Sequence, residues 1–528
     1  MRFGFSYIGL IWLIMILIPN FIWIKNKPND YEKYVVNENK LLLVLEKAGA
    51  AIVTCVALMF SDFNFKGWNF WCAVLIMSFL CMVLCEIFWV RYFKSEKTMK
   101  DFYSNLLGIP VAGATLPVIA FFLLGIYGGN GLMLFGSIIF GIGHIGIHLA
   151  HRKKVCEPKK KPLVRRILVG IPKVIISVLL IIVIAFFVVA IFGRNINQFE
   201  RAIEYKDGIN ESEYVMLNGQ EQYILTLGHD ISNPVMISLH GGPGAPTTAT
   251  DYCWIDDLTD DYTVISWDQR GCGRTYYHNA ENDPENSTVS FEQAVEDLDA
   301  LVDYACDRFG QDKVIIMGHS YGSLLGSQYA LDYPDKVSHY IGIGQEVLEE
   351  DWYSYIYVYE DALAKAKEVG DDTSEMEAVY QAFINDPNLI NMNAISNVTL
   401  KYHPVSVTSD VSTAATVFSP YMGVDDVRWL LVIAKALTGD DTYERLISPL
   451  MYHLLDFNAY KRSTDYQVPV LFISGSEDWS CPVGLIEEYF DVITAPRKDM
   501  YLLDGCGHSP QSQLPEEFGN AVKDFLGQ

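Results

Sequence analysis

The sequence lacks the closely paired cysteines of a zinc site or a disulfide framework. Of its ten cysteines, five lie in residues 1–193 and five in residues 194–528, and the second five show no C-x-x-C spacing. Basic residues are also scarce in 194–528, which holds 19 Lys and Arg against 55 Asp and Glu, a net charge of −36. Phosphates require a basic surface, so this balance argues against nucleic-acid binding. We expect neither a metal ion nor another cofactor.

The first 193 residues are instead apolar and basic, with 20 Lys and Arg and 9 Asp and Glu. They contain six apolar runs, and each approaches the ~20 residues that a helix needs to cross a bilayer. The second run is the weakest, because Glu46 and Lys47 interrupt its start. The sequence therefore predicts a bundle of about six transmembrane helices. The runs are 3–24, 41–60, 68–90, 105–127, 131–150 and 169–193.

The charges between these runs predict a topology. The first, third and fifth connections are basic, and Lys25, Arg91 and Arg152 are among their residues, whereas the second and fourth carry almost no positive charge. Basic connections lie on the cytoplasmic side. Six crossings then place both ends of this domain outside the cytoplasm. We expect a multi-pass protein of the cell membrane with an extracytoplasmic C-terminal domain. A signal peptide is the alternative for the first run, but no small-x-small cleavage site follows it.

Three histidines in and just after the fifth run, His144, His148 and His151, share one helix face. Ionisable groups at membrane depth are often functional, and a haem or metal site is one interpretation. The other is packing, because the glycine-rich stretch Gly136–Gly146 lets helices approach closely. The sequence contains no second ligand-rich helix, which favours packing. Neither an H-E-x-x-H motif nor a paired-glutamate helix indicates an enzyme in this part.

From about residue 200, short β-branched runs alternate with amphipathic stretches. This alternation predicts a parallel, doubly wound α/β sheet. Helices are expected at 290–308 and 322–332. The candidate catalytic residues all follow strand ends, where such sheets bind ligands. The expected strands are 235–239, 263–267, 314–317, 340–343, 470–473 and 498–502.

The segment Gly318-His319-Ser320-Tyr321-Gly322 lies between the expected strand 314–317 and the helix after it. A nucleophile elbow holds its serine in a sharp turn, and glycines two residues before and after it avoid clashes. Ser320 is therefore the predicted nucleophile. The segment His240-Gly241-Gly242-Pro243-Gly244 follows another strand, and its glycines expose backbone N–H groups that can bind an oxyanion. We expect an oxyanion hole formed by Gly242 and Tyr321.

An acid and a base follow two further strands. Asp478 is the last residue of the segment 475–478, and His508 is the last residue of the segment 505–508. His508 would take the proton of Ser320, while Asp478 would fix the tautomer of His508 and stabilise its imidazolium form. Glu477 is the alternative acid.

Together these motifs resemble the prolyl aminopeptidase (proline iminopeptidase) branch of the α/β-hydrolase superfamily. The likeness includes the polar segment 268–274, in which Asp268 and Arg270 are expected to brace neighbouring loops. It covers most of residues 210–528 and none of the membrane part. The resemblance implies an α/β-hydrolase fold with a helical cap at about 346–464. The elbow departs from the Gly-Gly-Ser-Trp-Gly that is common in that branch.

An aminopeptidase must recognise a cationic N-terminus beside the scissile bond, and a carboxylate in a partly dry cleft does this well. The acidic stretch Gln345–Asp351 leaves the expected strand 340–343 and enters the cap. Glu346 is the first candidate for this contact, followed by Glu349 or Glu350. The alternative is that these acids form a solvated face.

The sequence thus predicts a transmembrane domain, 1–193, and an α/β-hydrolase domain, 194–528. The predicted function is a membrane-tethered serine hydrolase, most simply an aminopeptidase that releases N-terminal residues, proline-type, from short peptides. An esterase or lipase acting near the membrane is one alternative. A transporter or receptor with a ligand-binding hydrolase-like domain is another. The expected partners are a small peptide or ester substrate and the lipid bilayer.

Overall fold

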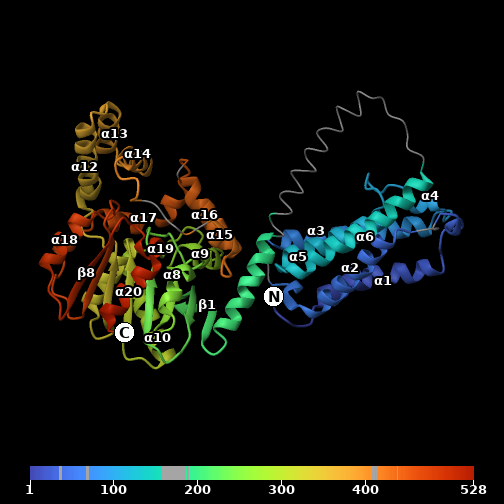
Figure 1. The fold of residues 1–528 in the computed structure, drawn as a ribbon, viewed down its shortest axis with the longest axis horizontal. Coiled ribbons are helices and arrows are strands. Elements are labelled where there is room, and N and C mark those ends of the chain that lie inside the picture. The colour runs from blue at the N-terminus through green and yellow to red at the C-terminus, as the bar shows by residue number, and fades with distance from the viewer. Residues whose placement is uncertain are drawn as a thin grey trace. The chain divides into compact units, whose positions relative to one another are not determined.

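Contacts divide the chain into two compact units, Met1–Asn197 and Gln198–Gln528. Figure 1 shows the helical N-terminal unit and the mixed α/β C-terminal unit. The computed structural model describes residues 1–34, 38–66, 71–156, 186, 189–406, 411, 413–436 and 438–527.

Within the described part of the N-terminal unit, four helices are long and apolar enough to cross a membrane. They correspond to the first, second, third and fifth apolar runs. The sequence thus located these helices, although length and composition do not establish a topology. They are α1 (Tyr7–Ile24), α2 (Lys40–Met59), α3 (Cys72–Phe93) and α6 (Gly131–Val155).

The fourth apolar run gives a shorter helix than the expected 105–127. Helix α5 spans Ala112–Gly128 and has 17 residues. Before it, Leu106 pairs with Ile109 across a tight turn, which a continuous helix cannot contain. The sixth run, 169–193, lies for the most part outside the described residues, so the expected six crossings are not confirmed.

The C-terminal unit is built on an eight-stranded sheet in the order β1-β2-β4-β3-β5-β6-β7-β8. Strands β3 to β8 run parallel, and β2 pairs antiparallel with both β1 and β4. The six expected strands are confirmed as β3 to β8. The strands are β1 (Ile209–Leu217), β2 (Gln220–Gly228), β3 (Val235–Leu239), β4 (Thr263–Trp267), β5 (Val314–His319), β6 (Val337–Ile343), β7 (Val470–Gly475) and β8 (Lys498–Leu503).

The edge hairpin of β1 and β2 was not among the expected strands. Its turn is Asn218-Gly219, and both residues have a positive φ, 43° and 82°. Asn-Gly between β-rich runs is a strong hairpin signal, because a two-residue turn of this type needs positive φ at both positions. This dipeptide could have revealed the hairpin.

Helices cover both faces of the sheet, which gives two apolar cores. On one face, buried residues of α10 (Phe291–Phe309), α11 (Tyr321–Asp332) and α18 (Val483–Val492) pack against the strands. On the other face, α8 (Tyr252–Ile255) and α20 (Pro515–Leu526) do so. The expected helices 290–308 and 322–332 are therefore confirmed, each shifted by about one residue.

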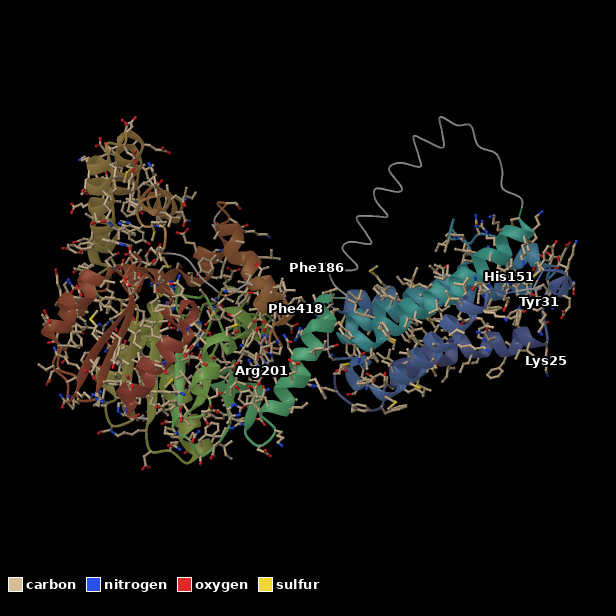
Figure 2. The ribbon with its side chains drawn as sticks, viewed as in Figure 1. Lys25, Tyr31, His151, Phe186, Arg201 and Phe418 are labelled. Atoms are coloured by element: carbon tan, nitrogen blue, oxygen red, sulfur yellow. The ribbon has the colours of Figure 1, made fainter. Side chains whose placement is uncertain are left out.

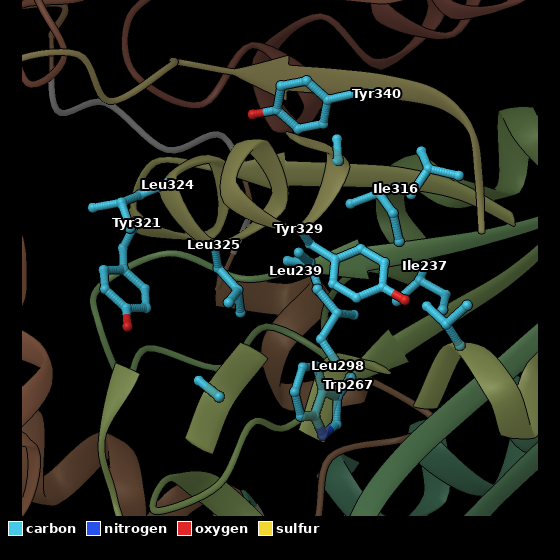
Figure 3. Close-up of a cluster of buried hydrophobic side chains, with 14 of the residues drawn as sticks. Ile237, Leu239, Trp267, Leu298, Ile316, Tyr321, Leu324, Leu325, Tyr329 and Tyr340 are labelled. Carbon is cyan, nitrogen blue, oxygen red and sulfur yellow. The ribbon is translucent and has the colours of Figure 1, made fainter. Parts of the chain in front are cut away.

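Figure 3 shows the first of these cores, where side chains of the strands, α10 and α11 gather in one cluster. Trp267, Tyr329 and Tyr340 are almost completely buried there. Burial of one such side chain contributes roughly 1.5–3 kcal/mol. This packing holds β5 and α11 in place, and thereby fixes the short turn between them.

The segment between β6 and β7 is helical, as the sequence predicts for the cap. Its described residues form six α-helices and two short 3-10 helices, Glu350–Trp352 and Ala459–Lys461. The α-helices are α12 (Tyr353–Val369), α13 (Ser374–Asn385), α14 (Leu389–Leu400), α15 (Thr413–Phe418), α16 (Val424–Ala436) and α17 (Thr442–Leu455).

Candidate active site

Ser320 occupies the sharp turn between β5 and α11, with φ 53° and ψ −126°. Such a backbone conformation costs a non-glycine residue about 1–3 kcal/mol. The neighbouring glycines make the turn possible. A Cβ atom on Gly318 would lie 2.2 Å from the carbonyl oxygen of Gly322, and one on Gly322 would lie 2.3 Å from that of Leu239. The turn therefore presents Ser320 at the carboxyl end of the sheet.

Asp478 and His508 follow β7 and β8 and contact each other directly. His508 Nδ1 lies 3.0 Å from Asp478 Oδ2 and 3.1 Å from Oδ1. The Asp478 side chain is buried, and its Oδ1 accepts the backbone N–H groups of Ser480 and Cys481 at 2.9 and 3.0 Å. These donors hold the carboxylate toward the imidazole. The alternative acid, Glu477, is exposed.

Three effects act on the pKa of His508. Burial alone would lower it, because the imidazolium loses its hydration. The Asp478 carboxylate and, to a smaller extent, Glu346 stabilise the imidazolium, and the net result is a pKa above the ordinary value. His508 is thus arranged to accept a proton and hold it.

The glycine-rich loop after β3 lies against the nucleophile. A Cβ atom on Gly241 would be only 3.0 Å from the Cβ of Ser320. Tyr321 opens α11, so its backbone N–H is one of the first-turn donors that have no partner within the helix. The ring of Tyr321 is buried in the core. Gly242 lines the cavity at Ser320, and backbone donors of this kind can stabilise an oxyanion.

The two other histidines near Ser320 have different contacts. His319 donates its Nε2 proton to the carbonyl oxygen of His508 at 2.7 Å. His240 donates from Nδ1 to the carbonyl oxygen of Gly241 at 2.9 Å. Burial lowers the pKa of each to about 4. Both are neutral at pH 7, and their bonds hold the loops that surround Ser320.

The polar segment 268–274 braces these loops. Asp268 accepts the hydroxyl of Thr248 at 2.5 Å and the backbone N–H of Arg274 at 2.9 Å. Arg270 pairs with buried Asp297, with Nε and Oδ2 2.6 Å apart. These contacts agree with the supporting role that the sequence indicates for Asp268 and Arg270.

A cavity of about 270 Å³ lies between the cap and the loops that carry Ser320 and His508. It brings the predicted nucleophile, base and substrate-binding acid together, and the predicted oxyanion loop closes one side. The lining residues that matter here are Gly242, Ser320, Glu346, Glu349, His403 and His508.

Glu346 and Glu349 form a buried pair of acids in this cavity. They are 6% and 5% exposed, so neither belongs to a solvated face. Among the described residues, Glu346 Oε2 has no hydrogen-bond partner, whereas Glu349 Oε2 accepts the hydroxyl of Ser354 at 2.6 Å. Burial raises both pKa values, and the neighbouring Glu346 raises that of Glu349 further. A cation entering the cavity would relieve this unfavourable burial of negative charge.

Sequence reasoning did not identify His403 and Ser406, which belong to the cap. His403 donates from Nε2 to Asp361 Oδ2 at 2.7 Å, and its ring stacks on Trp479 with 4.0 Å between centroids. Ser406 Oγ accepts the backbone N–H of Trp479 at 2.9 Å. No local motif marks these residues, because their partners lie more than forty positions away in the sequence.

Comparisons with known proteins agree with this architecture. A family described as having the alpha/beta hydrolase fold matches residues 234–374. The chain is 25% identical to a probable aminopeptidase, YbaC, of Bacillus subtilis over 331 residues, which cover 61% of this chain and 97% of that protein. It is 24% identical to a proline iminopeptidase of Lactobacillus helveticus over 320 residues, 59% of this chain and 95% of the relative.

Among solved structures, a proline iminopeptidase of Mycobacterium smegmatis aligns over 60% of this chain and 98% of its own, with 20% identity and a TM-score of 0.44. The family match and the two relatives give the C-terminal part of the chain an α/β-hydrolase fold, with homologues named as aminopeptidases and proline iminopeptidases.

Proposed function

We propose that this chain is a membrane-tethered serine hydrolase that releases N-terminal residues from short peptides. The observation that carries the proposal is the cavity in which Ser320, His508 and the buried acids Glu346 and Glu349 meet. Hydrolysis of an uncharged ester does not require two buried carboxylates beside the nucleophile. An aminopeptidase has a use for them, because its substrate brings a cationic α-amino group to that position.

In the proposed reaction, Ser320 Oγ attacks the carbonyl carbon of the first peptide bond, and His508 Nε2 takes the serine proton. Asp478 stabilises the imidazolium that forms. The backbone N–H groups of Gly242 and Tyr321 bind the oxyanion. His508 then gives its proton to the leaving amine. Water, deprotonated by His508, hydrolyses the acyl-enzyme and restores Ser320.

Glu346 is the proposed contact for the α-amino group, because its Oε2 is unpaired among the described residues and it lies close enough to His508 to affect its pKa. Glu349 is the second acid of the pair, and its Oε2 already accepts the hydroxyl of Ser354. The four apolar helices of the N-terminal unit are the proposed membrane tether. The basic connections between the apolar runs support an extracytoplasmic hydrolase domain.

A substrate panel on the full-length protein tests this proposal. It contains amides of several amino acids, prolyl amide among them, the same amides with an acetylated α-amino group, and short-chain acyl esters. We expect hydrolysis of the free-amine amides and loss of activity on their acetylated forms. Turnover of the esters alone would favour the esterase alternative.

A further inference from the structure

A row of polar side chains runs the length of helix α6 in the N-terminal unit. Asn130, Ser137, His144 and His151 recur every seven residues, and His148 lies one turn beyond His144, so all five share one face of the helix. At 1.5 Å per residue, the row from Asn130 to His151 is about 31 Å long, close to the ~30 Å thickness of the hydrocarbon core.

Glycines bring α2 against this face. A Cβ atom on Gly143 would lie 2.2 Å from the backbone nitrogen of Glu46, and one on Gly49 would lie 2.3 Å from that of Phe140. This close approach places the carboxylate of Glu46 beside the row. Glu46 Oε1 is 2.5 Å from His144 Nδ1, so α2 contributes a titratable partner at the middle of the row.

Toward one end of α6, the row continues through titratable groups in contact. The rings of His144 and His148 have centroids 4.6 Å apart. Tyr103, which follows α4 (Met99–Phe102), places its hydroxyl 3.2 Å from His148 Nδ1 and 3.3 Å from His151 Nδ1. His151 Nε2 lies 3.5 Å from Glu38 Oε1. Figure 2 shows His151 at the end of the N-terminal unit that also carries Tyr31 and Lys25.

Toward the other end, the row contains buried polar atoms without partners. Ser137 and Asn130 are fully buried, and among the described residues Ser137 Oγ and Asn130 Nδ2 have no hydrogen-bond partner. An unpaired polar atom in an apolar bundle is destabilising. Such atoms in proteins commonly hold ordered water, which can extend a hydrogen-bonded chain.

We propose that this row is a proton path through the helical unit, a function separate from hydrolysis that rests on the proposed membrane span. A proton entering at Glu38 and His151 passes through Tyr103 and His148 to the His144–Glu46 pair. It leaves past Ser137 and Asn130 through bound water, so that one proton is released for each one taken up.

The chemistry of the row fits protons better than metal ions. Imidazole, phenol and carboxylate groups exchange protons. Here they are distributed along α6 and do not surround a single position that a metal ion could occupy. In the described part of the chain, no three His, Cys, Asp or Glu side chains converge on a metal position. Helix α5 brings no charged side chain to the row, and Lys154 of α6 lies beyond its end.

Proton flux into liposomes tests this path. The full-length protein is reconstituted with an entrapped pH-sensitive dye, and valinomycin with potassium clamps the membrane potential while an inward pH gradient is applied. We expect faster acidification than in protein-free liposomes. Glu46→Gln and Ser137→Ala should return the rate toward the protein-free value. Lys47→Gln, which alters an exposed neighbour of Glu46, should conduct like the wild type.

Ser137→Ala keeps the packing almost unchanged, so it tests the path even where Glu46→Gln fails to fold. Equal rates of acidification in wild-type and protein-free liposomes would overturn the proposal. Wild-type proton flux in both Glu46→Gln and Ser137→Ala would also overturn it. Glu46→Gln should retain wild-type hydrolysis of the substrate panel. Loss of flux without loss of hydrolysis therefore separates this proposal from the hydrolase proposal.

Discussion

The backbone carbonyl oxygen of Ser406 accepts the backbone N–H of His508 at 2.8 Å. Ser406 belongs to the cap, whereas His508 is the proposed catalytic base. The same serine accepts the N–H of Trp479, the residue after Asp478, through its hydroxyl oxygen. Gly507 has no room for a side chain, because a Cβ atom there would lie 2.1 Å from the carbonyl oxygen of Val405. One short cap segment thus holds the loops of both the acid and the base.

From this contact we predict that Ser406→Ala lowers kcat and leaves KM almost unchanged. The substitution leaves the Trp479 N–H without its acceptor, which costs about 1 kcal/mol, or roughly five-fold in rate if the loss falls on the transition state. Ser396→Ala is the matched control, because Ser396 lines the same cavity but, among the described residues, bonds only within α14. Equal kcat values for the two variants would contradict the proposed effect of the cap on the loops of Asp478 and His508.

A second prediction concerns the pH dependence of kcat/KM. The base must be neutral to accept the Ser320 proton, and the pKa of His508 is raised above its ordinary ~6.5. Activity should therefore fall as the pH drops through a value above 6.5.

In Asp478→Asn the main cause of this increase is gone, and burial then lowers the pKa of His508. The acidic limb of the profile should move to lower pH, while the rate at its plateau falls by about 10⁴-fold. If the acidic limb of the pH profile lies at the same pH in the wild type and in Asp478→Asn, His508 is not the titrating base.

Substrate selectivity gives a third prediction. Glu346→Gln removes the negative charge proposed to bind the α-amino group, and a hydrogen bond to a charged group contributes about 1.5–3 kcal/mol. We expect kcat/KM for an aminoacyl amide to fall roughly 10- to 100-fold. Hydrolysis of an uncharged acyl ester should change little. Glu477→Gln is the control, because Glu477 is exposed. Parallel losses on both substrates would argue against amine recognition by Glu346.

The contiguous motifs account for what the sequence could predict. A strand, a turn and a helix around Ser320 are neighbours in the chain, so spacing alone indicates the elbow. The same holds for Gly242 after β3, and for Asp478 and His508 after β7 and β8. Parallel strands bring their carboxyl ends to one edge, which is why residues far apart in the sequence could be expected at one site.

The cap contacts could not be predicted in this way. His403 and Ser406 lie among helices, and a helical pattern gives the buried face but not the partner across the cavity. The late start of α5 had a local cause that hydropathy does not detect, the tight turn between Leu106 and Ile109. Burial of the pair Glu346 and Glu349 also depends on tertiary packing, since isolated acids are mostly exposed.

A fourth prediction concerns the side of the membrane on which the hydrolase domain lies. If the basic connections are cytoplasmic and the crossings number six, that domain is extracytoplasmic. Protease added to intact cells should then remove it, with detection by an antibody to the C-terminus. Cleavage only in inverted vesicles would mean that the number of crossings is odd.

The most direct measurement is covalent labelling of Ser320 by a fluorophosphonate, which reacts with activated serine nucleophiles. The full-length wild type should be labelled, and Ser320→Ala should not be, with turnover reduced by several powers of ten. Ser480→Ala, which alters another serine of the same cavity, should be labelled like the wild type. Undiminished labelling of Ser320→Ala would contradict the account of this chain as a hydrolase that uses Ser320.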